Sequence, residues 1–431
     1  MKFLNKVFGF DPTKHSVKTE IMAGLTSFLT MAYILSVNPT HFPNAGMDAG
    51  AVFTVTALIG ILSCTILATL AKMPFGLAPG MGSNMFFIYT VCVGMHYSWQ
   101  FALTAVFIEG IIFILLTLTN IRQTIANAIP KSLQKAIGVG IGLFITFVGL
   151  QSAGIVTDNA DTLVQLGNIT SGTGLLAIIG LVITSLLVVL NVKGGMLLGI
   201  LITTLIGVPM GITHFDGVIS APKSIAPIAF QLEWSSIFSV DMLKVVVAFF
   251  FIDFFNSTGT VVAMYPQNGF VDKDGKITNL KKVFLADAIG TTASGLLGSS
   301  AVVTFCESGS GVAQGGRTGL TSFTIAVCFF IALFFSPVFL AIPAAATAPV
   351  LIIVGLYMMS AIKEIDLADM SEAIPAFITI IMMPLAYSIA DGILLGIISY
   401  VLINACTGKF KKVSVVMYIL AAIFLAKYIF M

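Results

Sequence analysis

Two acidic residues lie in stretches of the sequence where a carboxylate is costly unless it has a chemical role. Asp253 is in the apolar run 249–259, and Glu307 is in the glycine- and serine-rich run 298–311. An ionised acid at membrane depth has to face a cavity, pair with another group or hold a proton. Burial also brings proton exchange towards physiological pH. We therefore expect both acids to bind a substrate or carry protons. A packing hydrogen bond is the alternative.

The run around Glu307 has a counterpart earlier in the chain. Residues 76–84 combine three glycines and a proline in otherwise apolar sequence. Such residues free backbone groups, which only protein or a water-lined cavity can satisfy inside a membrane. Interrupted segments at matching positions of two halves indicate a binding site near the middle of the membrane. We expect extended stretches around Ala78 and around Val302 and Val303, each leading into a half-helix. Glycines that permit close helix packing are the alternative.

Four further acids have weaker claims to a function. Asp287 could serve proton coupling or cap a helix, and both possibilities stay open. Glu109 could take a direct role or be an internal hydrogen-bond partner. Glu20 and Asp391 fall at the starts of apolar segments, where the helix dipole favours an acid. We expect these last two residues to be structural.

Several other chemistries do not fit the sequence. The histidines are expected in tails or loops, at His15, His41, His96 and His214. The cysteines lie in or beside apolar segments without paired spacing, so neither a disulfide framework nor a metal or cofactor site is expected. No glycine-rich loop ends in Lys-Ser or Lys-Thr, so we expect no ATP hydrolysis. The energy source is then an ion gradient, and the titratable acids favour protons over sodium.

Composition indicates that these residues belong to a polytopic, all-α membrane protein. Of the 431 residues, 58% are hydrophobic and 9% are charged, where a soluble domain has about a quarter charged. Mean hydropathy is +1.04, and the formal charge of +2 gives no sign of nucleic-acid binding. Apolar runs of spanning length predict fourteen membrane segments, at 20–38, 50–72, 80–94, 98–120, 133–156, 173–191, 194–212, 241–264, 283–299, 302–315, 318–341, 345–362, 372–389 and 391–407. A last apolar run, 413–431, is left open as a span or an interfacial helix.

The basic residues predict the orientation of these segments. With a cytoplasmic amino terminus, eighteen of the 21 basic residues fall in cytoplasmic connections, as the positive-inside rule requires. Lys223 and Lys244 are then outside, and Lys427 stays unassigned. The amino-terminal stretch lacks the apolar core and cleavage site of a signal peptide. We expect a multi-pass protein of the bacterial inner membrane.

Short sequence matches relate the two halves of the chain. Residues 148–150 (Val-Gly-Leu) recur at 354–356, and the Gly-x-Leu-Leu-Gly-Ile pattern of 195–200 recurs at 392–397. Both matches map a segment onto the seventh one after it. Because seven is odd, the second copy enters the membrane from the opposite side. This pattern predicts an inverted repeat of seven plus seven segments, which is common in secondary transporters.

Four stretches together resemble a known family: 23–35, 77–84, 136–145 and 304–308. They are similar to the nucleobase-ascorbate transporter superfamily, and within it to the purine permeases for adenine, guanine and hypoxanthine. The similarity runs from about residue 10 to residue 430.

The resemblance implies a division into a core (transport) domain and a gate domain, homodimers, and an elevator-like motion of the core against the gate. In this sequence the parts would be a cytoplasmic tail (1–19), the core domain (20–120 and 241–341, segments one to four and eight to eleven), the gate domain (121–240 and 342–407) and an extra hydrophobic segment (408–431).

The resemblance also implies site residues. Substrate binding is expected at Gly82, Asn84, Asp253, Glu307 and Ser308. For proton coupling the candidates remain the acids singled out above from the residues themselves, Asp253, Asp287 and Glu307. Hypoxanthine and guanine present an N1–H donor beside an O6 acceptor, and an ionised carboxylate accepts strongly from such a donor. Aromatic neighbours could stack on the base, with Phe86, Phe254 and Phe305 as candidates.

Residues 307–308 read Glu-Ser, where xanthine and urate carriers of the family have an amide pair. This difference favours purines that donate towards an acid. We therefore expect a proton-coupled importer of purine bases, with hypoxanthine and guanine ahead of adenine. The nearest rival is a transporter of the same fold for uracil, xanthine or an anion. An intramembrane aspartyl protease and a passive channel are further alternatives. The protease would need two converging acids in a Gly-x-Gly-Asp context, which the sequence lacks.

Overall fold

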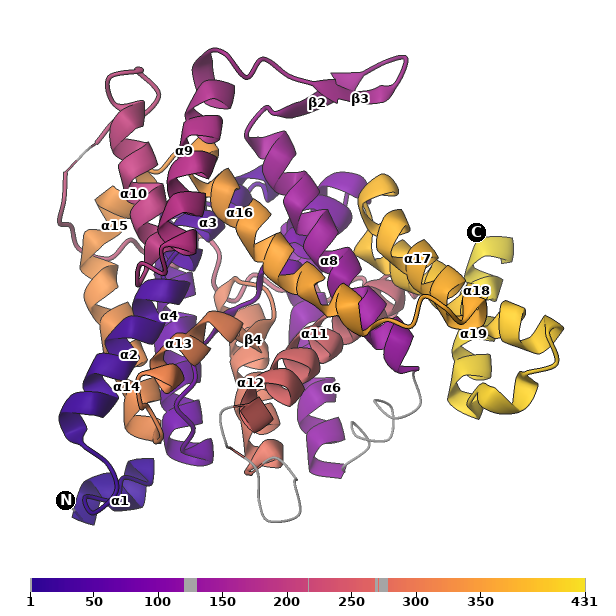
Figure 1. Cartoon of the computed structure of the whole chain (residues 1–431), viewed down its shortest axis with the longest axis horizontal. Coiled ribbons are helices and arrows are strands. Elements are labelled where there is room, and N and C mark those ends of the chain that lie inside the picture. The colour runs from indigo at the N-terminus through magenta and orange to yellow at the C-terminus, as the bar shows by residue number, and fades with distance from the viewer. Residues whose placement is uncertain (1, 120–129, 216, 268–269, 271–277, 431) are drawn as a thin grey trace.

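The computed structural model describes residues 2–119, 130–215, 217–267, 270 and 278–430, and this part of the chain is mostly helical (Figure 1). The first half contains α1 (Lys2–Phe8), α2 (Val17–Met31), α3 (Ile34–His41), η1 (Phe42–Ala45), α4 (Ala49–Ile66), η2 (Leu67–Ala71), α5 (Met81–Met85), η3 (Phe86–Gly94), α6 (Trp99–Thr119), α8 (Lys131–Ser152), α9 (Gly172–Val189) and α10 (Gly195–Gly207). The second half contains α11 (Val240–Gln267), α12 (Leu280–Leu297), η4 (Cys306–Ser308), α13 (Gly309–Ala313), α14 (Gly319–Ala332), η5 (Leu333–Phe335), α15 (Ser336–Leu340), α16 (Ala344–Met359), η6 (Ser360–Glu364), α17 (Met370–Leu385), α18 (Ile389–Cys406), η7 (Phe410–Lys412) and α19 (Val415–Phe430).

The helical content follows from the apolar sequence. In lipid every backbone polar group needs a partner inside the protein, and a helix supplies it within one segment. Side-chain caps satisfy first-turn N–H groups at several helix starts. Asp48 accepts from the backbone of Ala51 at the start of α4, over 2.7 Å. Asp369 starts α17, and hydrogen bonds from Ser371 hold the pKa of its carboxyl well below the ordinary value.

Within the described residues, seven helical spans are long and apolar enough to cross a membrane by length and composition. They are Val17–Ala45, Ala49–Ala71, Trp99–Thr119, Lys131–Ser152, Gly172–Val189, Gly319–Leu340 and Ala344–Glu364. Shorter apolar helices are Met81–Gly94, Gly195–Gly207, Met370–Leu385 and Asp391–Cys406. The count of fourteen segments stays a prediction.

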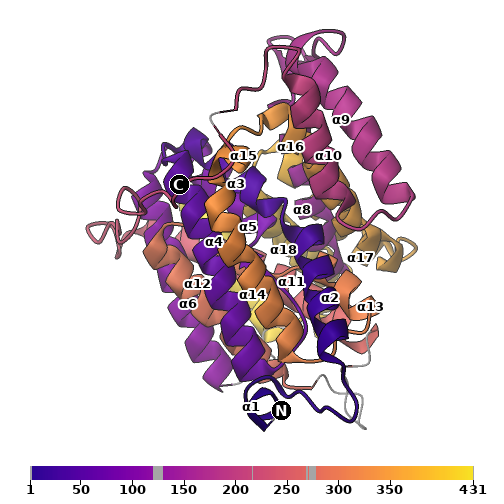
Figure 2. The ribbon, with the colours of Figure 1, turned by 90° about the vertical axis from the view of Figure 1, so that its left-hand side faces the viewer.

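The helices pack in two groups. In one, α14 packs on α2 and α4, and α12 packs on α6; in the other, α8 packs on α16 and α17, and α9 packs on α10 and α16 (Figures 1 and 2). Glycines allow the closest approaches, as small residues do between membrane helices. A Cβ on Gly142 of α8 would lie 2.6 Å from the carbonyl oxygen of Gly355 in α16. Buried side chains from several helices, among them Phe86 of η3, Phe144 of α8 and Phe249 of α11, form one apolar cluster.

Two small antiparallel strand pairs complete the fold. β1 (Leu77–Pro79) pairs with β4 (Val302–Thr304), with Ala78 opposite Val303. These strands include the positions where the sequence predicts extended stretches. The second pair, β2 (Val156–Asn159) and β3 (Leu163–Leu166), is an exposed hairpin between α8 and α9. Figure 1 shows this hairpin at the opposite end of the molecule from α1.

Candidate functional site

The β1–β4 pair brings the two glycine-rich segments together. Besides the strand pairing, the backbone N–H of Gly80 donates to the carbonyl of Ala301 over 2.8 Å. A Cβ on Gly80 would lie 2.7 Å from a methyl carbon of Val303, so this close crossing requires a glycine. Each strand leads into a short helix, β1 into α5 and β4 into η4 and α13. The helix starts of the two segments therefore lie on either side of one strand pair.

Glu307 is held by two side chains of the first apolar segment. The hydroxyl of Tyr33 donates to Oε1 of Glu307 over 2.8 Å, and the hydroxyl of Thr30 donates to its carbonyl oxygen over 3.0 Å. Tyr33 lies between the end of α2 and the start of α3. The interruption of this segment thus presents a phenol to the carboxylate.

Glu307 also lines a cavity of about 260 Å³, which we call the Glu307 cavity. Thr30 and Ser310 line the same side, while Asn191, Lys193 and Tyr357 belong to the α9–α10 connection and α16 on the other side. The cavity therefore lies between the two helix groups. It brings one of the acids predicted from the sequence to a space that a solute can enter.

Asp253 is 1% exposed and lies on α11. The hydroxyl of Ser257, one turn later, donates to its Oδ1 over 3.2 Å. Helix α11 packs against both β4 and α5. Asp253 and Glu307 thus come from elements that adjoin the same strand pair.

The other predicted substrate residues have internal partners. Asn84 is fully buried; its Nδ2 donates to Oδ1 of Asn38 over 2.7 Å, and its Oδ1 accepts from the hydroxyl of Ser300. The buried hydroxyl of Ser308 donates to the carbonyl of Phe305. Gly82 faces α8, since a Cβ there would lie 3.0 Å from Cγ2 of Ile141. These contacts connect α5 and η4 to the surrounding helices.

Three weaker candidate acids, Asp287, Glu109 and Asp391, lie on three different helices. Asp287 is 2% exposed on α12, whose Thr291 accepts from the backbone of Val302 in β4 over 3.0 Å. Glu109 is fully buried on α6. Asp391 lies in the first turn of α18, as expected for a residue favoured by the helix dipole.

Glu20 has a role that the sequence did not reveal. Its carboxylate accepts from the backbone N–H groups of Arg317 and Thr318 over 3.0 and 3.2 Å, just before α14 begins. It therefore fixes the turn that leads into α14, 297 residues away in sequence. The sequence analysis predicted a structural role for Glu20, but only through the dipole of the helix in which Glu20 itself lies.

The candidate stacking residues differ in their surroundings. Phe86 packs edge-on against Phe249 with ring centroids 4.8 Å apart, and Phe254 stacks on Phe250 at 5.7 Å. Phe305 lies 6.1 Å from the ring of Tyr33, which itself binds Glu307. Phe305 is therefore the candidate connected most directly to the acid.

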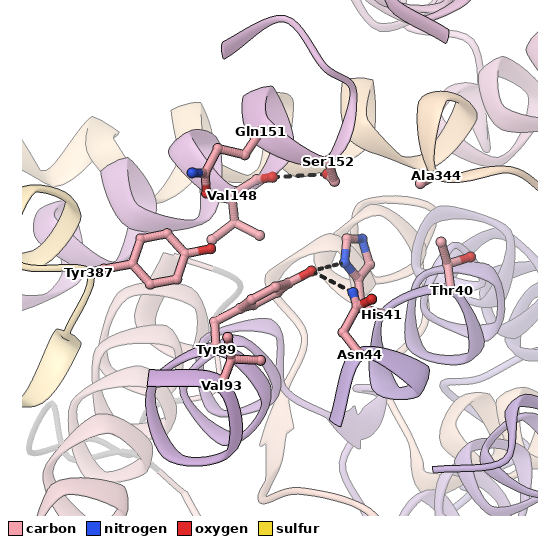
Figure 3. Close-up of a pocket in the computed structure, with 10 residues that line it drawn as sticks. All are labelled: Thr40, His41, Asn44, Tyr89, Val93, Val148, Gln151, Ser152, Ala344 and Tyr387. Atoms are coloured by element: carbon pink, nitrogen blue, oxygen red, sulfur yellow. Dashed lines mark hydrogen bonds between the residues drawn. The ribbon is translucent and has the colours of Figure 1, made fainter. Parts of the chain in front are cut away.

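A larger cavity, of about 550 Å³, is lined by Gln151 and Ser152 at the end of α8, shortly before the β2–β3 hairpin, and we call it the Tyr89 cavity (Figure 3). Tyr89 receives a hydrogen bond from Nδ2 of Asn44 over 3.0 Å and is 2.8 Å from Nδ1 of His41. The expectation that His41 lies in a loop is wrong: it ends α3 and is 1% exposed. The predicted segment stopped before Pro39, but the helix continues through this proline.

No sequence pattern pointed to this cluster. Its members come from separate elements, with His41 and Asn44 at the end of the first segment and Tyr89 in η3. The available signals were weak, namely a histidine next to an apolar segment and a tyrosine in a phenylalanine-rich run.

Comparison with known families decides the class of the protein. The family model described as "Permease family" matches residues 18–395. The chain belongs to this family. It is the nucleobase-ascorbate transporter family that the sequence resembles, so this prediction is confirmed. The chain is accordingly a multi-pass membrane transport protein.

Curated relatives extend over the whole chain. A putative permease of Methanocaldococcus jannaschii is 48% identical, over 100% of this chain and 99% of that protein. A guanine/hypoxanthine permease of Bacillus subtilis is 44% identical, over 98% of this chain and 99% of the relative. An adenine permease of Escherichia coli is 38% identical, over 99% of this chain and 96% of the relative.

A solved structure supports the fold. The transmembrane domain of a cyanobacterial bicarbonate transporter aligns with a TM-score of 0.64 and covers 88% of this chain and 97% of that domain. Its sequence is 15% identical, so the similarity concerns the fold alone.

Proposed function

We propose that this permease takes up purine bases together with protons, with hypoxanthine and guanine preferred over adenine. The observation that carries the proposal is Glu307, an acid that Tyr33 holds beside a cavity next to the β1–β4 pair. The names of the relatives, guanine/hypoxanthine and adenine permeases, support the class of substrate.

The chemistry of Glu307 matches the edge of these purines. An ionised carboxylate accepts from N1–H, and from the amino group of guanine as well. Asp253 is the second acid beside the strand pair, and we assign the proton to it, with Asp287 and Glu307 as further members of the relay. Asn84, Gly82 and Ser308 hold the site in place, because their hydrogen bonds and contacts are internal.

The two cavities favour an elevator-like mechanism. In the proposed division, residues 20–120 and 241–341 form the moving core, and residues 121–240 and 342–407 form the gate. Both cavities are lined by residues of both parts, so displacement of the core would close one cavity and open the other. The antiparallel β1–β4 pair supports fourteen segments as two inverted repeats, broken at their third members. We extend the proposal to a homodimer in a bacterial inner membrane.

The proposed orientation has a cytoplasmic amino terminus. Cysteines introduced at Lys14, in the exposed amino-terminal region, and at Thr162, in the exposed β2–β3 hairpin, form a matched pair. In intact cells an impermeant thiol reagent should label Thr162→Cys and spare Lys14→Cys. The reverse pattern would invert the orientation.

Uptake of radiolabelled hypoxanthine tests the function. Unlabelled guanine and hypoxanthine should compete most strongly and adenine less, and uptake should rise as external pH falls and collapse with a protonophore. Competition by uracil, xanthine or bicarbonate alone would favour another solute on the same fold. Dependence on sodium without any response to the protonophore would reject proton coupling.

A further inference from the structure

The Tyr89 cavity contains a chain of hydrogen bonds that is not part of the Glu307 site. Nδ2 of Asn44 donates to the Tyr89 hydroxyl, so that hydroxyl is free to donate its own proton to Nδ1 of His41, 2.8 Å away. A neutral histidine that accepts at Nδ1 carries its proton on Nε2. Nε2 of His41 is buried and has no hydrogen-bond partner within the described residues. Nε2 is therefore out of reach of a ligand, and the polar group that the cluster presents to the cavity is the exposed amide of Asn44.

The lining of the cavity indicates what kind of ligand it would bind. Besides the three cluster residues it comprises Thr40, Val93, Val148, Gln151, Ser152, Ala344 and Tyr387. None of these side chains is a carboxylate, lysine or arginine, so the cavity offers no counter-charge to an ionic ligand. Amide, hydroxyl and imidazole groups alternate with apolar surface, which suits a neutral, flat ring with donors and acceptors on its edge. The volume of about 550 Å³ is within the usual range for small-molecule sites.

Two tyrosines provide flat surfaces for such a ring. Tyr89 and Tyr387 meet edge-to-face with centroids 6.0 Å apart, and Phe144 and Phe147 of α8 also contact the Tyr387 ring. Tyr387 has a backbone φ of +51°, which is unusual for a bulky residue and indicates that its surroundings hold the ring in place. Figure 3 shows Tyr89 and His41 on one side of the space and Gln151 and Ser152 on the other.

We propose that the Tyr89 cavity is a second binding site for a purine base, separate from the Glu307 cavity and on the side from which the base enters. The entry side rests on the proposed function and orientation. Here the amides of Asn44 and Gln151 pair with the edge of the base, and a tyrosine stacks on its face. Because residues of both the proposed core and the proposed gate line the cavity, movement of the core would release the base from this site towards Glu307.

Cysteine protection can separate this site from the Glu307 site. In a chain whose native cysteines are replaced by serine, Val93→Cys puts a thiol in the cavity lining, where the side chain is 42% exposed. Hypoxanthine should slow its reaction with an impermeant thiol reagent. The half-protecting concentration should be unchanged when Glu307→Gln is added. In uptake, by contrast, Glu307→Gln should weaken the apparent affinity for hypoxanthine at least tenfold.

Two variants test the lining of the Tyr89 cavity, and a third variant serves as a control. Asn44→Leu and Gln151→Leu each remove a neutral hydrogen-bonding group and should raise the half-protecting concentration about three- to tenfold. Asn159→Ala, in the exposed hairpin and outside the cavity, should leave it unchanged. Equilibrium dialysis of the unmodified, purified chain with radiolabelled hypoxanthine should find two sites per chain. In the Glu307→Gln variant, one of these two sites should bind much more weakly.

The outcomes separate the two proposals. No protection at saturating hypoxanthine together with one site by dialysis would overturn the second site. The second site would also be overturned if Glu307→Gln raised the half-protecting concentration by the same factor as it weakened the apparent affinity in uptake. In both cases the Glu307 assignment would stand. Uptake unaffected by Glu307→Gln would instead overturn the Glu307 assignment, whatever the protection data show.

Discussion

The segment after β1 and the segment after β4 start from the same strand pair, but their polar residues have different surroundings. Asn84 in α5 is fully buried, and both ends of its amide bind Asn38 and Ser300. Glu307 in η4 is half-buried and faces a cavity, with one carboxylate oxygen bound by Tyr33. The first segment has the contacts of a support, and the second has those of a recognition site.

This difference suggests how a repeated architecture can serve an asymmetric ligand. The strand pair constrains the backbone where the segments cross, and Gly80 meets Val303 there. The polar side chains carry no such constraint, so one copy can stabilise the crossing while the other binds the solute. Substitutions should therefore change stability in the first segment and affinity in the second.

Asp253→Asn should have the largest effect of all. Asparagine keeps the shape but cannot carry a proton, so accumulation of hypoxanthine against its gradient should be abolished, while binding or exchange persists. Uptake into energised vesicles, compared with exchange in de-energised vesicles, measures both properties. Accumulation at the normal level would remove Asp253 from the coupling mechanism.

Glu307→Gln should weaken hypoxanthine affinity about ten- to a hundredfold. The amide sets a donor against the purine N1–H in place of a charge-assisted acceptor, and such a bond is worth about 1.5–3 kcal/mol. Competition binding measures the affinity, and thermal unfolding should show little change. If Glu307→Gln caused a large loss of stability and left the affinity unchanged, Glu307 would be a support like Asn84, and the contrast between the two segments would fail.

Asn84→Leu should show the opposite pattern. It leaves Asn38 and Ser300 without their partner, and each unsatisfied buried group costs about 1–3 kcal/mol. The unfolding temperature should fall, while hypoxanthine affinity changes less than threefold. A tenfold weaker affinity with unchanged unfolding temperature would instead make Asn84 a direct substrate contact, as the sequence predicts.

Sequence patterns were informative where a local rule applied. Glycine and proline in apolar runs indicated the positions of β1 and β4, and the cost of a buried charge singled out Asp253 and Glu307. Hydrogen bonds between distant segments follow no such rule. The Tyr33–Glu307 bond joins residues 274 positions apart, and Tyr89 meets His41 across 48 positions. Such pairs depend on how the segments pack, which a single sequence does not contain.

Tyr33→Phe should have the smallest effect and should act through Glu307. The substitution removes only the hydroxyl that donates to Oε1 over 2.8 Å, so the ring contact with Phe305 can persist. We expect KM for hypoxanthine to rise about three- to tenfold, with little change in kcat or unfolding temperature, because the carboxylate loses a partner that fixes its direction. In a Glu307→Gln background the same substitution should add much less, since coupled residues have non-additive effects. Equal effects in both backgrounds would show that Tyr33 acts independently of Glu307, and would leave the acid without the support assigned to it.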